Sequence, residues 1–161
     1  MANTDVTLAT AVDTLSQQER SAGFTHKWVI DYTDIDEGTG STDTVTAALG
    51  NTPASFFVTK CIGYITTAFA NGGSGTLTVQ VGTDGDPNNY MAATALITTG
   101  TGTTAGPIGA ASGVIPTLAG SAGTSSDVLE ALFTNSVGDS PSTLTAGKLV
   151  ILMQIAEIEL P

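Results

Sequence analysis

Residue types that could carry catalysis are scarce in this chain, which has one histidine and one cysteine. A serine or cysteine nucleophile needs a histidine beside it as base, and an acidic residue that orients the histidine. His26 opens a strand-like stretch, no Gly-x-Ser-x-Gly turn accompanies it, and no pattern brings it to Cys61. We therefore expect His26 to be a strand-edge residue, Cys61 to be a buried thiol, and the protein not to be an enzyme.

Metal binding is the second kind of chemistry to consider. One histidine and one cysteine cannot form a zinc cluster. Calcium takes oxygen ligands from acidic loops, and residues 34–38 and 82–89 have that composition. Neither segment contains the twelve-residue EF-hand pattern, and Asp, Gly, Asn and Pro are also the residues that turns require. We expect no metal and no cofactor, and we name Asp84 and Asp86 as the pair at which a cation would be tested.

The charge balance is strongly acidic. Fifteen carboxylates face only four strong bases, Arg20, Lys27, Lys60 and Lys148, so the formal net charge is −11. Binding to nucleic acid requires cations that neutralise phosphates, so we expect no direct contact with nucleic acid. Charged residues make up only 12% of the chain, about half the usual share, and the mean hydropathy is +0.23. This composition favours a surface that other chains cover in part.

The length of 161 residues suits one domain. The sequence opens without a basic segment followed by an apolar one, and it has no stretch of about 18 uncharged apolar residues. We expect no membrane span, and a protein that is made and kept in a cytoplasm or is exported by other means.

From residue 26 onward, apolar residues recur with the period of two that is typical of strands. Residues 71–74 have the composition of a hairpin turn. Segment 55–70 lacks a clean alternation, which predicts a strand covered on both faces or bent near Gly63. After Ile155 the phase slips, which predicts a bulge or a passage from the core to an interface. The clearest strand-like segments are residues 27–34, 44–49, 55–70, 76–81, 128–134 and 147–160. Seven or eight strands with little helix predict an all-β fold, an antiparallel β-sandwich with jelly-roll-like closure.

Residues 1–25 form an N-terminal arm that precedes the sandwich domain of residues 26–161. The arm has too few apolar residues to fold alone, so it must lie on the body or on a neighbour. It is either a short helix that ends near Gly23 or an extended segment. Its apolar residues are the candidate partner-binding residues: Val6, Leu8, Val12 and Leu15.

An uncharged stretch runs from Pro87 to Ser126, and after Thr98 it is mostly Gly, Ala, Thr and Ser. This composition predicts a long loop around residues 98–126. The loop is either a weakly ordered surface excursion or a segment ordered by contact with another subunit.

Several segments together resemble a known class of proteins. They are the opening strand HKWVIDY (residues 26–32), the central segments at 64–69 and 77–86, and the closing LTAGKLVIL (residues 144–152). With the short polar arm, they resemble the small structural proteins of tailed bacteriophages, particularly the β-sandwich decoration or cement proteins of the capsid surface. The resemblance covers most of residues 26–158. The arm departs from a specific pattern, since it has no aromatic or proline motif that identifies a docking mode.

The resemblance implies a homotrimeric, jelly-roll-like protein that is made in the host bacterial cytoplasm. It would sit on the outer surface of the virion capsid, bind the major capsid protein and clamp neighbouring subunits. Two alternatives stay open. One is another phage structural module, such as a tail, adaptor or fibre-base part. The other is a carbohydrate-binding or adhesin-type β-sandwich, which would expose Trp28, Tyr64 and Tyr90 on one surface, whereas burial of Trp28 would count against it.

Overall fold

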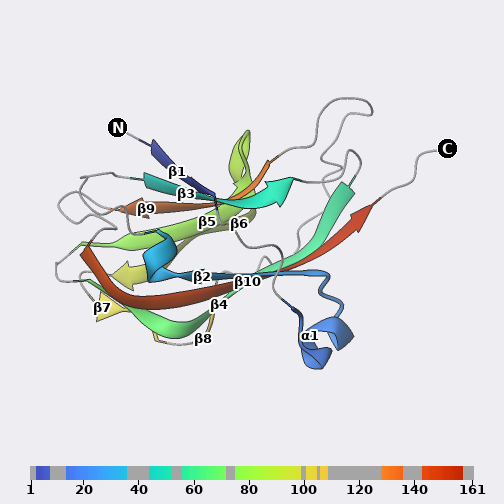
Figure 1. The fold of residues 1–161 in the computed structure, drawn as a ribbon, viewed down its shortest axis with the longest axis horizontal. Helices are drawn as coiled ribbons and strands as arrows, with labels where there is room; N and C mark the ends of the chain where they lie inside the picture. Colours follow the sequence, from blue (N-terminus) through green and yellow to red (C-terminus); the bar gives the residue numbers. More distant parts are fainter. Residues whose placement is uncertain are drawn as a thin grey trace.

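The computed structural model describes residues 3–7, 14–35, 44–51, 56–71, 75–98, 101–104, 106–108, 128–135 and 143–157. These residues form two sheets that pack face to face as an all-β sandwich (Figure 1). The six-stranded sheet contains, in spatial order, β1 (Asn3–Thr7), β3 (Thr44–Asn51), β9 (Val128–Asn135), β5 (Leu77–Thr83), β6 (Asp86–Thr98) and β7 (Thr101–Gly102). The four-stranded sheet contains β2 (His26–Asp31), β10 (Leu144–Glu157), β4 (Phe56–Asn71) and β8 (Gly106–Ile108). A short helix, α1 (Gln17–Ser21), precedes β2, and a 3-10 turn, η1 (Tyr32–Asp34), follows it.

Most connections carry the chain from one sheet to the other. Among the described strands, only β5, β6 and β7 follow one another within one sheet. All neighbouring strands pair antiparallel except β1, which pairs parallel with β3. The hairpin predicted at residues 71–74 is wrong, because β4 and β5 lie in different sheets. A short Gly-rich turn has the same composition whether it reverses a strand within a sheet or crosses to the facing one.

The core follows the alternation of the sequence. Trp28 and Ile30 of β2 point inward, as do the residues of β3, β5 and β10 that share the apolar phase. These inward residues are Val45, Ala47, Leu49, Leu77, Val79, Val81, Leu149, Ile151 and Met153, and each exposes less than 7% of its surface. Their burial confirms the predicted inward phases and removes apolar surface from water on both inner faces, which stabilises the sandwich.

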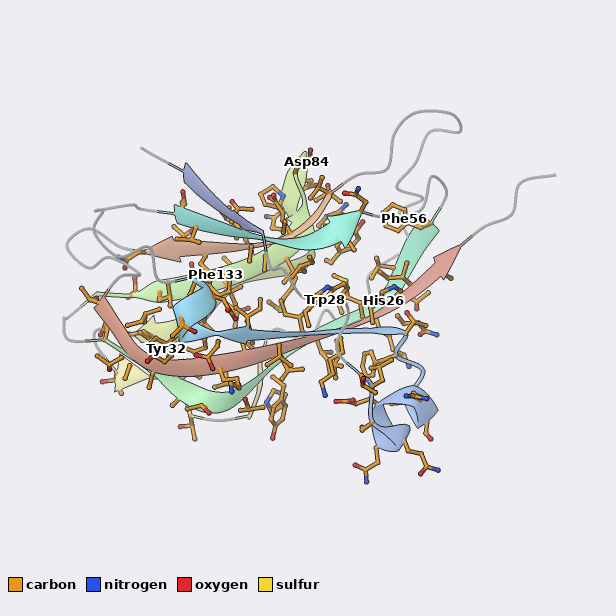
Figure 2. The ribbon with its side chains drawn as sticks, in the orientation of Figure 1. His26, Trp28, Tyr32, Phe56, Asp84 and Phe133 are labelled. Atoms are coloured by element: carbon orange, nitrogen blue, oxygen red, sulfur yellow. The ribbon has the colours of Figure 1, made fainter. Side chains whose placement is uncertain are left out.

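Trp28 connects the two sheets by a hydrogen bond. Its indole Nε1 donates to the carbonyl of Leu49 at 2.7 Å, within the buried layer (Figure 2). The acceptor comes from an irregular point of β3, where the register to β9 shifts between Ala48 and Gly50 and Gly50 has φ +127°. The bulge leaves Leu49 without a partner in the β3–β9 ladder, and the Leu49 carbonyl instead accepts the hydrogen bond from the indole across the core.

A second irregularity lies where β10 pairs with β4. Gly147 has φ +147°, and a Cβ at this position would overlap the ring of Phe69, which is buried on β4, the neighbouring strand of the same sheet. The register between β10 and β4 shifts before this glycine, between Leu144 and Ala146, and again across it, between Ala146 and Lys148. Gly147 therefore lets the aromatic ring lie against the backbone, in a conformation that L side chains rarely adopt.

The irregularities bear on two features of the sequence pattern. The register between β10 and β4 shifts between Gln154 and Ile155, but the residue left without a partner is Thr59, so this bulge lies in β4. Ile158 and Leu160, which follow the predicted phase slip, lie outside the described residues. The mixed pattern of β4 arises from these shifts and not from coverage of both faces, since Tyr64 on its outer side is 42% exposed.

The uncharged stretch is more regular than its composition indicates. Its first part belongs to β6, which buries Tyr90, Met91, Leu96 and Ile97. The predicted loop around 98–126 also contains β7 and β8, which close the edges of the two sheets. A strand built largely of Ala, Thr and Asn lacks the strong propensity by which strands are recognised. Residues 109–127 lie outside the described part of the chain.

The arm contributes to the sandwich at both ends of its length. Asn3–Thr7 forms β1, the edge strand beside β3, and Gln17–Ser21 forms α1 on the other side of the molecule (Figure 1). Both predicted alternatives, extended segment and short helix, thus occur in the one arm, and Gly23 follows the helix with φ +89°.

We predict that Trp28→Phe destabilises the fold by about 2–3 kcal/mol. The substitution leaves the Leu49 carbonyl without its buried donor and removes part of a core side chain. Urea unfolding followed by circular dichroism measures this loss. The control Tyr64→Phe, at an exposed aromatic residue, should change stability by less than about 0.5 kcal/mol. Equal effects of the two variants would contradict a special role for the indole.

We predict that Gly147→Ala costs about 1–3 kcal/mol, because the methyl group overlaps the Phe69 ring and the backbone is strained. The matched control is Gly85→Ala, since a Cβ at Gly85 meets nothing within 4 Å and its φ is not positive. Thermal melts of both variants test the prediction, which fails if Gly147→Ala melts with the wild-type protein.

Candidate partner-binding surface

The outer face of the four-stranded sheet carries an apolar stripe. The register places Val150 between Val29 and Tyr64, and Tyr64 lies opposite Pro107. One step along the sheet, Leu152 lies opposite Ile62. These side chains point away from the core because their chain neighbours, such as Trp28 and Leu149, point into it. We define the apolar stripe as Val29, Ile62, Tyr64, Pro107, Val150 and Leu152. Tyr64 and Pro107 are its exposed members, whereas Val150 and Leu152 expose only 8% and 7% of their surface beneath their neighbours.

All four strong bases of the chain surround this stripe. Lys27, Lys60 and Lys148 are outward residues of β2, β4 and β10, and Arg20 lies on α1, next to the same face. Lys27 pairs with Glu19 at 3.0 Å, and Lys148 pairs with Asp31 at 3.1 Å. These four are the only strong bases of the chain, so its positive charge lies on one side of the molecule, together with the carboxylates of Glu19 and Asp31.

Helix α1 is fixed beside this face by several polar contacts. Ser16 and Glu19 form a capping box, in which the Ser16 hydroxyl accepts from the Glu19 backbone N–H and the Glu19 carboxylate accepts from the Ser16 N–H. Lys60 donates to the Ala22 carbonyl at 2.8 Å. Burial alone would raise the pKa of Glu19, but the hydrogen bonds from Ser16 and Lys27 together hold this pKa below its usual value. Glu19 is therefore ionised at neutral pH and ties α1 to β2.

Asp31 and Lys148 form the polar border at the other end of the stripe. Burial would raise the pKa of Asp31, yet the Lys148 ammonium and the hydrogen bonds of Thr33 lower it. The Asp34 carboxylate accepts from the Asp31 backbone N–H at 2.7 Å, so these acidic residues cap η1. Asp36 and Glu37, the rest of the first calcium candidate, lie outside the described residues.

The second calcium candidate is a tight turn. Thr83 pairs with Asp86, so Asp84 and Gly85 form the tip of the β5–β6 hairpin, and both aspartates are exposed. The Asp84 backbone N–H donates to the Val128 carbonyl at 3.2 Å. A Cβ at Gly82 would overlap the Asp86 carbonyl, so this glycine permits the close approach of the two strands. The residues that resemble a calcium loop here serve the turn; among the described residues, no three His, Cys, Asp or Glu side chains gather in a group that could hold a metal.

Cys61 and His26 lie in different surroundings. Cys61 is buried, and burial raises the pKa of its thiol to about 12, so it is no thiolate at neutral pH. His26 stacks on Trp28 with 5.7 Å between the ring centroids, and its Nδ1 lies 2.7 Å from the Thr25 hydroxyl (Figure 2). Burial lowers the pKa of His26.

The four candidate residues of the arm do not gather in one place. Val6 lies in β1, opposite Ala47 at the edge of the six-stranded sheet. Leu15 is half-buried before α1, and its carbonyl accepts from Arg20 Nε at 3.1 Å. Leu8 and Val12 lie outside the described residues. The sequence shows that β2 and β10 each have apolar residues among their outward positions, such as Val29 and Val150. Only the pairing register shows that these residues lie side by side on one face.

The comparisons with known proteins provide no relative. No protein-family model matches the chain, and no curated protein and no solved structure matches it. Within the described part of the chain, no helix is long and apolar enough to cross a membrane.

We predict that His26 titrates below 6.5, its ordinary pKa, because burial disfavours the imidazolium. The unfolded chain then binds a proton more readily than the folded one, so stability is full above pH 6.5 and falls as the pH drops through the lowered pKa. Since the chain has one histidine, a single NMR resonance reports the midpoint. In His26→Gln this part of the stability loss should vanish, and a midpoint at or above 6.5 would show the prediction to be wrong.

Proposed function

We propose that this chain is a non-catalytic structural protein of a tailed-phage virion. It decorates and stabilises the outer surface of the capsid by binding the major capsid protein. The observation that carries a protein-binding role is the outer face of the four-stranded sheet, where an apolar stripe lies among all four strong bases. The assignment to a phage capsid rests on the resemblance of residues 26–158 to decoration proteins.

The fold supports this proposal in kind. Eight strands, β2 to β6 and β8 to β10, alternate between the sheets except at the β5–β6 hairpin, and they stand in the orders β2-β10-β4-β8 and β3-β9-β5-β6. This alternation supports the jelly-roll-like closure that the resemblance implies. β1 joins only β3, at the edge of the sandwich, so the arm that we assign to capsid binding begins at an accessible border of the fold.

The charge supports the outer surface of the capsid. At a net charge of −11, a chain that faced packaged DNA would meet repulsion, with four bases to offset it. Two of these bases are already paired with carboxylates of the chain itself. The low share of charged residues supports a homotrimer, in which part of each surface is covered.

A carbohydrate-binding role is less well supported than a structural one. Sugar platforms use exposed aromatic rings, but Trp28 and Tyr90 expose only 3% and 2% of their surface. Of the three candidate aromatic residues, Tyr64 alone is exposed. A tail, adaptor or fibre-base module has the same general requirements as a decoration protein, and the test below distinguishes these roles.

We predict that deleting residues 2–13 leaves a folded β-protein that binds heads at least tenfold more weakly. The deletion removes β1 and the arm residues Val6, Leu8 and Val12, whereas α1 and the rest of the sandwich remain. Co-sedimentation with purified heads of the phage that encodes the chain measures binding, and Gln18→Ala, exposed on α1, is the control.

Three outcomes separate the roles. Weakened binding to heads supports the arm as the capsid contact. Undiminished binding would keep the decoration role and refute the role of the arm. If the full-length chain binds purified tails but not heads, the capsid assignment is wrong and the tail module is favoured.

A further inference from the structure

The apolar stripe and the bases around it form one surface that no described part of the chain occupies fully. Tyr64 keeps 42% of its surface exposed at the centre of this face. Lys60 and Arg20 are also exposed at its border, and neither makes an ion pair within the described residues. A surface of this kind fits a partner that presents carboxylates beside small uncharged groups.

We infer that this face binds the β5–β6 hairpin of a second copy of the chain, in a head-to-tail interface. The inference rests on the proposed homotrimer for the closure of the assembly, and it names the two surfaces that such a trimer would use. Asp84 and Asp86 at the hairpin tip of one copy would lie against Lys60 and Arg20 of the next.

Charge segregation favours this occupant over a symmetric contact between two like faces. Lys27 and Lys148 are neutralised by Glu19 and Asp31 on the same face. Lys60 and Arg20 carry its unpaired positive charge, and packing the face on its own equivalent would bring these two bases toward the same two bases of the other copy. Asp84 lies on the opposite side of the molecule from α1 (Figures 1 and 2), and Asp86 belongs to the same hairpin tip, where it pairs with Thr83. A contact between the two sides brings Lys60 and Arg20 of one copy toward the carboxylates of the hairpin of the next, which offsets part of the repulsion that a net charge of −11 imposes on self-association.

The hairpin is built to present its carboxylates rigidly. The Thr83–Asp86 pairing fixes both ends of the tip, and the Asp84 backbone is held by the Val128 carbonyl. The close approach at Gly82 further constrains the two strands. A segment that is already ordered loses little conformational freedom on binding, so its charge contacts contribute more to affinity.

A head-to-tail contact joins two different surfaces, and it must close into a ring or continue as a filament. Cyclic closure of three copies is the trimer of the proposed function. In such a ring each copy uses its basic face once and its acidic hairpin once, so neither surface is left unpaired.

Self-association of the purified full-length chain tests the inference. Light scattering coupled to gel filtration should give close to three times the chain mass of 16.1 kDa at low salt. Lys60→Glu and Arg20→Glu should each weaken association at least tenfold, as should the double variant Asp84→Lys/Asp86→Lys. Raising NaCl from 50 to 500 mM, at which the Debye length falls to roughly 4–5 Å, should weaken the wild-type assembly as well.

Combining the changes in one chain is the decisive measurement. A chain that carries Lys60→Glu together with Asp84→Lys/Asp86→Lys should regain the association that the face variant and the hairpin variant each lose, because its altered face then meets a hairpin of opposite sign at every contact of a three-membered ring. Thr98→Glu, an exposed change at the end of β6, is the control and should leave association unchanged. Circular dichroism melts verify that the variants are folded, and Arg20→Glu replaces Lys60→Glu if loss of the Lys60–Ala22 bond unfolds the chain.

Each other outcome overturns the inference. If the face variants abolish association and the hairpin variant does not, the face packs on its own equivalent or on another surface. A trimer that survives all the charge changes would leave the proposed oligomer standing and refute these surfaces. A wild-type chain that is monomeric at 100 μM would refute the interface, whereas binding to heads would still decide the proposed function.

Discussion

The hydrogen bond between the Trp28 indole and the Leu49 carbonyl joins β2 to β3 across the core, and the arrangement of the outer surface depends on it. A strand shows alternate residues to opposite faces, so the side that faces inward determines the side that faces out. With Trp28 and Ile30 inside, Lys27 and Val29 must lie outside. A slip of β2 by one residue would bury a lysine and expose the indole, and both changes would cost free energy. The buried donor and its acceptor therefore specify the composition of the surface as well as the packing of the core.

The existence and inward phases of most strands follow from the sequence, because burial on one face imposes a period of two. Which strand pairs with which does not follow from the sequence pattern, because the backbone hydrogen bonds between two strands are the same whichever strands are neighbours. Residues 71–74 illustrate the difference: their composition indicates a turn, yet the strands that they connect belong to facing sheets. β6 escaped prediction for another reason. Its buried residues Tyr90, Met91, Leu96 and Ile97 are separated by Ala, Thr and Asn, and the register shifts in its pairing with β5 disturb the alternation.

The candidate surface was predictable only in part, since it combines residues that are far apart in the sequence. The outward phase of Lys27 follows from the apolar phase of its own strand. That Lys148 lies opposite Asp31, and Val150 between Val29 and Tyr64, follows from the antiparallel register of β10, which local sequence does not specify. Apolar residues of the arm were visible because they are close in sequence, but Val6 and Leu15 lie in different parts of the fold. Proximity along the chain was thus a poor guide to proximity in space.

The distribution of charge connects the fold to its proposed role. An acidic protein resists association with copies of itself, because each copy repels the next through the same net charge. Confining all four bases to one face changes that repulsion into a directional preference, since one orientation brings this face toward the acidic side of a neighbour. The apolar stripe supplies short-range attraction once the orientation is right. Spread evenly over the surface, the same four bases would lower the repulsion slightly without selecting an orientation. A chain with few charged residues can therefore specify how it assembles, provided that its strands place the rare bases on the same side of one sheet.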